Sequence, residues 1–137
     1  MKLFVDTNVL LDHIAARQPF AREAAHIWAL SESDRVHGYV SAISFNNVWY
    51  IVRKAAGRKE ADRAVRLIRD VFHTVALGER LLNRAIDAGF DDFEDAIQFH
   101  AAAQVKAQYL VTRDPGDFPD TGPAILTPAE FLGIVRQ

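Results

Sequence analysis

The stretch LFVDTNVLLDH, residues 3–13, places a short apolar run directly before Asp6 and lets a second apolar run follow at once. The first run is unbroken and β-favouring, which predicts a buried strand over residues 3–6. From Val9 to Ile14 the apolar residues recur at helical spacing. Asp is a favoured helix N-cap because its carboxylate accepts N–H groups of the first turn. Capping alone would explain Asp6, so the rest of the chain must decide whether it also carries chemistry.

Strand-like and helix-like segments alternate along the rest of the chain. Further strands are predicted over 36–41, 72–77, 109–112 and 124–126, and helices after Pro19 and over 44–56, 59–71, 79–88, 91–108 and 127–136. Such alternation implies parallel pairing with helical crossovers. We therefore expect an α/β fold, a three-layer α/β/α sandwich with a central parallel sheet of four or five strands. At this length it is a single domain over residues 1–137.

The composition excludes several classes of protein. The chain has no cysteine, so disulfides and thiolate metal sites are ruled out and a reducing compartment is compatible. No apolar run approaches the length of a membrane span and no signal peptide precedes the first strand, so we expect a cytoplasmic protein without a membrane partner. The net charge of −2 does not by itself indicate a nucleic-acid binder.

Acidic residues converge on one predicted edge of the sheet. In open parallel sheets, ligands bind outside the carboxyl ends of the strands. Asp6 ends the first strand, and Asp114 and Asp117 follow the fourth. The helix before the fourth strand runs antiparallel to it, so Asp95 in its first turn lies at the same edge. We expect these carboxylates to meet in one cleft.

Each of these acids also has a purely structural explanation. Asp92 with Asp95 is a variant of the capping box, and Asp114-Pro115-Gly116 is an ordinary turn signal. Capping, however, does not require that all of them lie at the same end of the sheet. Clustered carboxylates raise one another's pKa unless a cation compensates, and oxygen-only ligands without His or Cys suit Mg²⁺ or Mn²⁺ rather than zinc. Carboxylates with such ions are the usual equipment for phosphodiester hydrolysis.

Four further observations are the segments FVDTNVLLD, SAISFNNVWYIVRK, FEDAIQFHAA and YLVTRDPGDF. In order and spacing they resemble the motifs of PIN-domain proteins, which include the VapC-type ribonuclease toxins of bacterial toxin–antitoxin pairs. The resemblance runs from residue 3 to the ILTPAEFL ending. It implies a parallel-sheet α/β/α fold and a Mg²⁺- or Mn²⁺-dependent endoribonuclease acting on RNA. It also implies a homodimer and a cognate antitoxin partner.

Three positions match the acids that the family uses for catalysis and metal binding, namely Asp6, Asp95 and Asp114. The resemblance assigns two further polar residues and one accessory metal-binding acid to the same site: Asn8, Thr112 and Asp117. These assignments are what the resemblance implies for this chain.

One position departs from the family pattern. The second motif usually carries Glu or Asp where this chain has Asn47, and an amide offers an oxygen without negative charge. The resemblance therefore implies that Asn47 points into the cleft and that the site has one negative charge fewer. The alternative function is therefore a PIN-fold module that binds RNA or protein with weakened or no nuclease activity. A phospho-acceptor signalling domain is rejected, because the required acidic pair, acceptor Asp and Lys are replaced by Asp6-Thr7, Leu77-Gly78 and Thr127-Pro128.

Two features between residues 45 and 69 could contact RNA. Phe45, Trp49 and Tyr50 could stack on bases, although their helical spacing favours core packing or a dimer face. Basic residues dominate the segment 53–69, which could contact phosphates or form a solvated helix face.

Overall fold

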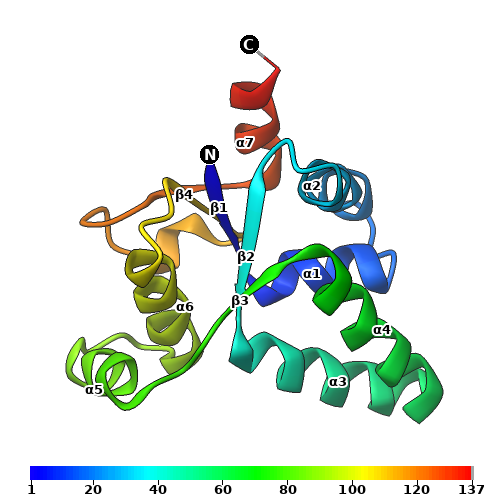
Figure 1. The fold of residues 1–137 in the computed structure, drawn as a ribbon, viewed down its shortest axis with the longest axis horizontal. Helices are drawn as coiled ribbons and strands as arrows, with labels where there is room; N and C mark the ends of the chain where they lie inside the picture. The colour runs from blue at the N-terminus through cyan, green and yellow to red at the C-terminus, as the bar shows by residue number, and fades with distance from the viewer. Residues whose placement is uncertain (137) are drawn as a thin grey trace.

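A computed structural model describes residues 1–136 as a parallel five-stranded sheet with the order β3-β2-β1-β4-β5 (Figure 1). Its strands are β1 (Lys2–Val5), β2 (His37–Ser41), β3 (His73–Val75), β4 (Tyr109–Val111) and β5 (Ala124–Leu126). Phe4 in the central strand pairs with Tyr39 on one side and Leu110 on the other. The predicted parallel sheet is confirmed with five strands. The single domain expected over 1–137 extends to Gln137, which lies outside the described residues.

Helices cover both faces of the sheet and form the outer layers of the predicted sandwich (Figure 1). They are α1 (Thr7–Ile14), α2 (Ala21–Glu32), α3 (Ala42–Ala56), α4 (Arg58–Val71), α5 (Glu79–Asp87), α6 (Phe93–Gln104) and α7 (Pro128–Val135). Alternate residues of β1 enter opposite cores because side chains alternate along a strand. Leu3 and Val5 pack with α1–α4 and α7, whereas Phe4 packs with α5 and α6. The three-layer α/β/α architecture is thus confirmed.

The strand order reverses beside β1. The chain runs outward from β1 through β2 to β3 with α1–α4 on one face, and then returns through α5 and α6 on the other face to β4. β4 therefore lies next to β1, with Val5 paired to Val111 at their carboxyl ends. Open parallel sheets bind ligands at such a switch point.

Two boundaries differ from the predicted ones in ways that concern the site. Asp6 lies just outside β1 and is the N-cap of α1, although its N–H still donates to the carbonyl of Val111. The helix predicted over 91–108 is shorter, because Asp92 caps its start and Lys106 adopts a φ of 56° after its end. The residues there favour helix, but Gln108 has to extend and donate its N–H to the Lys2 carbonyl beside the sheet.

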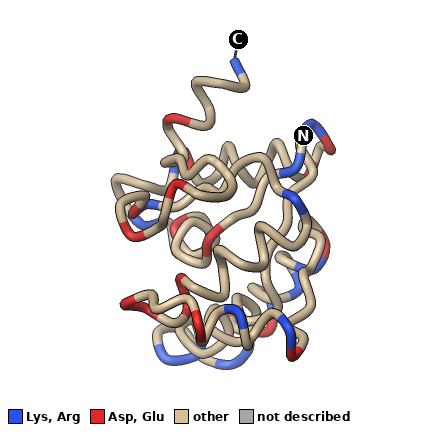
Figure 2. Tube along the Cα trace, turned by 90° about the vertical axis from the view of Figure 1, so that its left-hand side faces the viewer, with Lys and Arg blue, Asp and Glu red and all other residues tan. Residues whose placement is uncertain are grey.

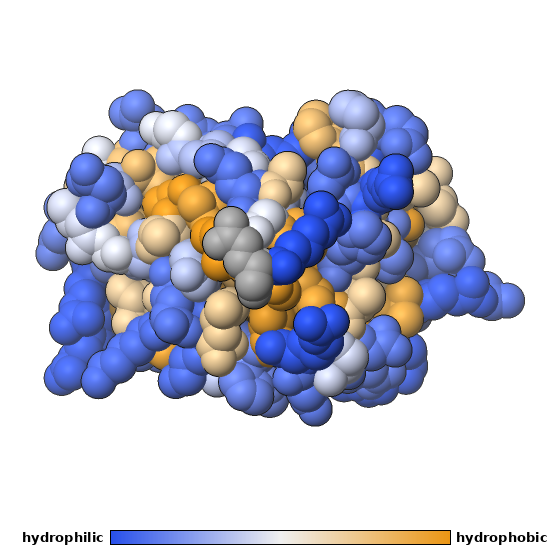
Figure 3. Space-filling model, turned by 90° about the horizontal axis from the view of Figure 1, so that it is seen from above, coloured by the Kyte–Doolittle hydropathy of each residue, from blue (hydrophilic) through white to orange (hydrophobic). Residues whose placement is uncertain are grey.

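The end of the molecule opposite the carboxyl ends of the strands carries apolar residues among hydrophilic ones, as Figure 3 shows from above. A groove of about 440 Å³ between α2 and α7 is lined in part by Leu30, Leu132 and Val135. Within residues 1–136, no helix has the length and apolar character that crossing a membrane requires.

Candidate active site at the carboxyl edge of the sheet

Asp6 is a buried carboxylate held by three donors. Its side chain is only 5% exposed. Its Oδ1 accepts the Thr7 N–H at 2.8 Å and the Gln98 Nε2–H at 3.2 Å, and its Oδ2 accepts the Thr112 hydroxyl at 2.8 Å. Burial raises the pKa of the Asp6 carboxyl, while the hydrogen bonds oppose that rise because they favour the ionised form. The protein therefore fixes this carboxylate in one orientation.

Thr112, directly after β4, links the carboxyl ends of β1 and β4 through its hydrogen bonds. Its Oγ1 donates to Asp6 and accepts the Asp114 N–H at 3.2 Å and the Asn8 Nδ2–H at 3.4 Å. Asn8 also accepts the Arg113 N–H at 3.4 Å. The structure thus places Asn8 and Thr112 as residues that orient Asp6 and the loop after β4.

A cleft of about 310 Å³ opens beside Asp6 between α1, α3 and α6. Asp95, Glu94, Asn8 and Asn47 line it together with Asp6, as do Asp92, Thr7, Leu11, Tyr50 and Ile51. Burial, followed by the charges of Asp92, Asp6, Asp117 and Glu94, raises the pKa of the Asp95 carboxyl to about 7 from its ordinary 3.8. The acids of this cleft are therefore close enough to destabilise one another's ionised forms.

A largely buried polar network underlies the cleft, and four of its members, Thr7, Ser44, Glu94 and Gln98, were not predicted as site residues from the sequence. Gln98 is fully buried on α6, and its Nε2 lies within 3.2 Å of oxygens of Asp6, Thr7 and Ser44. The Thr7 hydroxyl forms a 2.7 Å hydrogen bond with the Ser44 hydroxyl and lies 2.9 Å from Glu94 Oε2, to which it donates. The one available signal was Gln98 itself, a polar residue in the apolar stripe of its helix.

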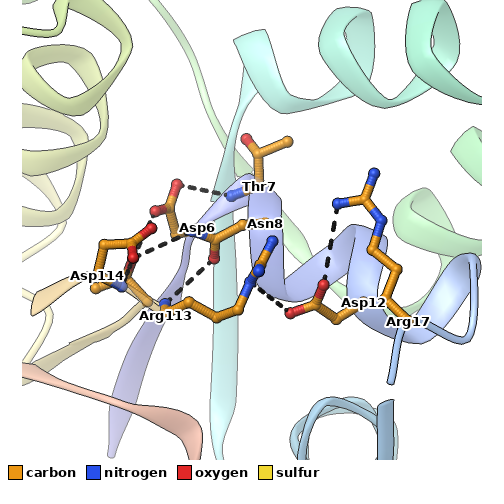
Figure 4. A network of polar contacts seen from close by, with 8 residues as sticks. Asp6, Thr7, Asn8, Asp12, Arg17, Arg113 and Asp114 are labelled. Atoms are coloured by element: carbon orange, nitrogen blue, oxygen red, sulfur yellow. Dashed lines mark hydrogen bonds and ion pairs between the residues drawn. The ribbon is translucent and has the colours of Figure 1, made fainter. Parts of the chain in front are cut away.

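An ion pair attaches the loop after β4 to α1. Arg113 Nε lies 2.9 Å from Oδ2 of Asp12, a carboxylate of α1 that is 1% exposed (Figure 4). Arg17 approaches the other oxygen of Asp12 at 4.0 Å, and the Arg113 guanidinium lies 4.4 Å from the centre of the Phe20 ring. Neither Asp12 nor Arg113 was predicted as part of the site.

A family model for the PIN domain matches residues 2–115. The chain belongs to the PIN domain family. The match includes every acid described above except Asp117, which lies two residues beyond it. No curated protein is significantly similar to the chain.

Solved structures share the PIN fold at low sequence identity. VapBC2 from Rickettsia felis, bound to a promoter DNA fragment, has a TM-score of 0.70 at 12% identity and covers 91% of this chain and 97% of its own. A toxin–antitoxin complex from Klebsiella pneumoniae has a TM-score of 0.68 at 22% identity, with 93% and 98% covered. VapC20 of Mycobacterium tuberculosis, a toxin that cleaves the sarcin–ricin loop, has a TM-score of 0.65 at 19% identity, with 79% and 86% covered. At these identities the likeness is one of fold.

The predicted acids of this PIN domain lie at one edge but not all in one cleft. Asp6 and Asp95 line the cleft, whereas Asp114 and Asp117 are exposed on the neighbouring loop. In residues 1–136, no three His, Asp or Glu side chains are gathered closely enough to hold a metal ion as they stand. The donor chemistry nevertheless fits a hard divalent cation, since the polar side chains of the cleft offer carboxylate, amide and hydroxyl oxygens and no imidazole nitrogen. A cation would also relieve the carboxylate repulsion that adds to the effect of burial in raising the pKa of Asp95.

Two aromatic residues of α3 and several basic residues lie at the same end of the molecule as the cleft. Trp49 is half-buried and donates to Asp62 at 2.8 Å, which joins α3 to α4. Tyr50 is 54% exposed and lines the cleft. Basic positions also lie at the end of the molecule where the parallel strands finish, as Figures 1 and 2 show together. Positive charge is therefore available at the same end of the molecule as the acidic cleft.

Proposed function

We propose that this PIN domain is a metal-dependent endoribonuclease and the toxin of a type II toxin–antitoxin pair. The observation that carries the proposal is the cleft at the β1–β4 switch point, where the carboxylates of Asp6, Asp95 and Glu94 line one cavity and offer oxygen ligands for a cation. The membership of the PIN family supports it, and so does the likeness in fold to a toxin that cleaves the sarcin–ricin loop.

The residues of the chain hold the reacting groups in place. Thr112 and Gln98 keep the Asp6 carboxylate oriented toward the cleft, and the Asn8 contacts fix the loop that carries Asp114. Asp6, Asp95 and Asp114 would bind Mg²⁺ or Mn²⁺ with Asp117 as an accessory. A divalent ion supplies positive charge for a phosphoryl oxygen and activates water. The RNA strand would lie along the carboxyl edge, with basic side chains nearby for its phosphates.

The decisive experiment measures cleavage of a generic single-stranded RNA by the purified protein. We expect cleavage with Mg²⁺ or Mn²⁺ and none in the presence of a chelator. Asp6→Asn should abolish cleavage while the protein stays folded, because Asn also caps helices well. Undiminished cleavage by the folded mutant would assign the activity to a contaminant or to another site.

The antitoxin partner is part of the proposal. An apolar groove of about 510 Å³ between α1, α3 and α4 shares Leu11 and Ile51 with the acidic cleft. A partner segment with an apolar face and a basic residue could therefore cover the groove and the cleft together. Expression in a bacterial host should arrest growth, and co-expression of the neighbouring small reading frame should restore it. Growth arrest by the Asp6→Asn mutant would contradict the toxin role of the nuclease.

The cytoplasmic location and the homodimer follow from the same proposal. The apolar groove between α2 and α7 offers a surface away from the cleft. Sedimentation velocity tests the homodimer, for which a monomer at micromolar concentration would be the contrary result.

The second candidate is a PIN-fold binding module, and Asn47 in the cleft favours it. A module would bind RNA or a partner protein without cleaving any RNA. RNA binding that survives Asp6→Asn, combined with no cleavage by either protein, would support the module.

A further inference from the structure

The cleft has a neutral side chain where the family pattern has an acid. Asn47, on the second turn of α3, lines the same cleft as Asp6 and Asp95. An amide can coordinate a cation through its oxygen but contributes no charge, and cation affinity in oxygen sites depends on ligand charge. The cleft would lose this charge unless another segment supplies it.

Glu94 brings a further carboxylate into this cleft from the opposite wall. It lies in the first turn of α6, is half-buried and lines the cleft with Asn47. An acidic residue in a first helical turn usually serves the helix dipole or caps its own backbone. Here the capping position is already filled, because Asp92 accepts the Asp95 N–H at 3.0 Å. Glu94 instead reaches the Thr7 hydroxyl of α1 at 2.9 Å.

A continuous set of hydrogen bonds links Glu94 to Asp6. Gln98 Nε2 lies 3.2 Å from Asp6 Oδ1 and 3.0 Å from Thr7 Oγ1, and Thr7 Oγ1 lies 2.9 Å from Glu94 Oε2. Gln98 and Thr7 are both buried, so the two carboxylates are oriented by side chains enclosed in the protein. Glu94 also lines the same cleft as Asp6 and Asp95, so its carboxylate lies among theirs.

We propose that Glu94 supplies the carboxylate that Asn47 lacks, so that the cleft keeps its charge for a divalent cation. This inference rests on the proposed function, because it concerns the same metal site. It assigns the acid to α6 instead of α3. Thr7 and Gln98 are then positioning residues for this carboxylate.

The test is a charge exchange measured by calorimetric Mn²⁺ titration. Glu94→Gln keeps an oxygen for the Thr7 hydroxyl and removes only the charge, so we expect Mn²⁺ affinity to fall about tenfold or more. Adding Asn47→Glu to that mutant returns the charge from α3 and should restore most of the affinity. Glu79→Gln changes an exposed acid in the first turn of α5 and should leave binding unchanged.

Unfolding in chelator gives a second readout that does not depend on activity. If Glu94 belongs to the charge cluster, Glu94→Gln should raise the unfolding midpoint because a repulsive charge is removed. A purely structural Glu94 would give a lower midpoint and unchanged Mn²⁺ affinity, which would overturn the inference. Failure of the double mutant to regain affinity would also overturn it. Absence of Mn²⁺ binding by the unmodified protein would overturn the proposed function together with the inference.

Discussion

The hydroxyl of Thr112 donates a 2.8 Å hydrogen bond to Oδ2 of the buried Asp6, so that the end of β4 orients the carboxylate that follows β1. The hydroxyl oxygen of Thr112 also accepts the N–H of Asp114. One side chain thus sets the relation between two acids that lie far apart in the sequence. Its loss should affect both the ionisation of Asp6 and the loop that carries Asp114.

Thr112→Val should weaken the site without changing its shape. The lost hydrogen bond opposes the effect of burial, so the pKa of Asp6 should rise further and the acid limb of the pH–rate profile should move to higher pH. A hydrogen bond to a charged group contributes about 1.5–3 kcal/mol, so unfolding should also become easier by about that amount. Thr112→Ser retains the hydroxyl and should behave like the unmodified protein. A Val mutant with an unshifted profile would show that this bond does not set the ionisation of Asp6.

Breaking the ion pair between the buried Asp12 and the half-buried Arg113 should destabilise the fold far more than breaking an exposed pair. Arg113→Met leaves a carboxylate that is 1% exposed with only Arg17 at 4.0 Å, so urea unfolding should lose about 3 kcal/mol. Arg69→Met removes an exposed partner of Asp70 and should cost less than about 1 kcal/mol.

A double-mutant cycle tests this explanation. Asp12→Leu combined with Arg113→Met removes both charges and should recover much of the lost stability. Equal costs for Arg113→Met and Arg69→Met would refute the importance of the buried pair.

Much of this site could be predicted from the sequence because its parts are local. An apolar run that ends on Asp6 marks both the strand end and the cap, and Asp95 was placed by its position in the first turn of its helix. Asn47 was expected in the cleft from the second motif and does line it. These inferences needed only the period of each element and the rule that parallel strands end at one edge.

The remaining parts depend on contacts between distant segments, which the period of a helix does not give. Gln98 reads as an irregular polar residue until α6 packs against α1 and α3. Arg113 and Asp12 each resemble ordinary surface charges in the sequence, and only the adjacency of β4 to β1 brings them together. Glu94 was not assigned to the site from the sequence, because it lies at a helix start, where acids are common.

The stability of the protein in chelator should fall as the pH rises from about 4 to 7. Burial and neighbouring carboxylates raise the pKa of Asp95 to about 7, whereas the unfolded chain releases this proton near 3.8. The folded state therefore holds more protons in this range, and deprotonation at higher pH destabilises it. After allowance for solvent screening, the loss should be on the order of 2 kcal/mol.

Urea unfolding at pH 5 and pH 8 measures this loss. Asp95→Asn should reduce the dependence on pH and leave the part that comes from Asp6 and Asp12, whose pKa values burial also raises. Asp87→Asn, an exposed control at the end of α5, should leave the dependence unchanged. Mn²⁺ should restore stability at pH 8 if it binds the cleft. A protein that is equally stable at both pH values in chelator would contradict the raised pKa of Asp95.

Tyr50 should contribute to binding of single-stranded RNA by stacking on a base. Its ring is 54% exposed on the cleft wall, and the Lys54 ammonium lies 5.3 Å from the ring centre, where it could also meet a phosphate. Stacking of a base on an aromatic side chain contributes about 1–3 kcal/mol. Tyr50→Ala should therefore weaken binding of a short RNA by about that amount and raise KM more than it lowers kcat. Tyr50→Phe should keep both constants near their original values, as should Ile86→Ala, which removes a side chain that is 62% exposed on α5. If Tyr50→Ala binds RNA as tightly as Ile86→Ala does, the exposed ring has no part in recognising the substrate.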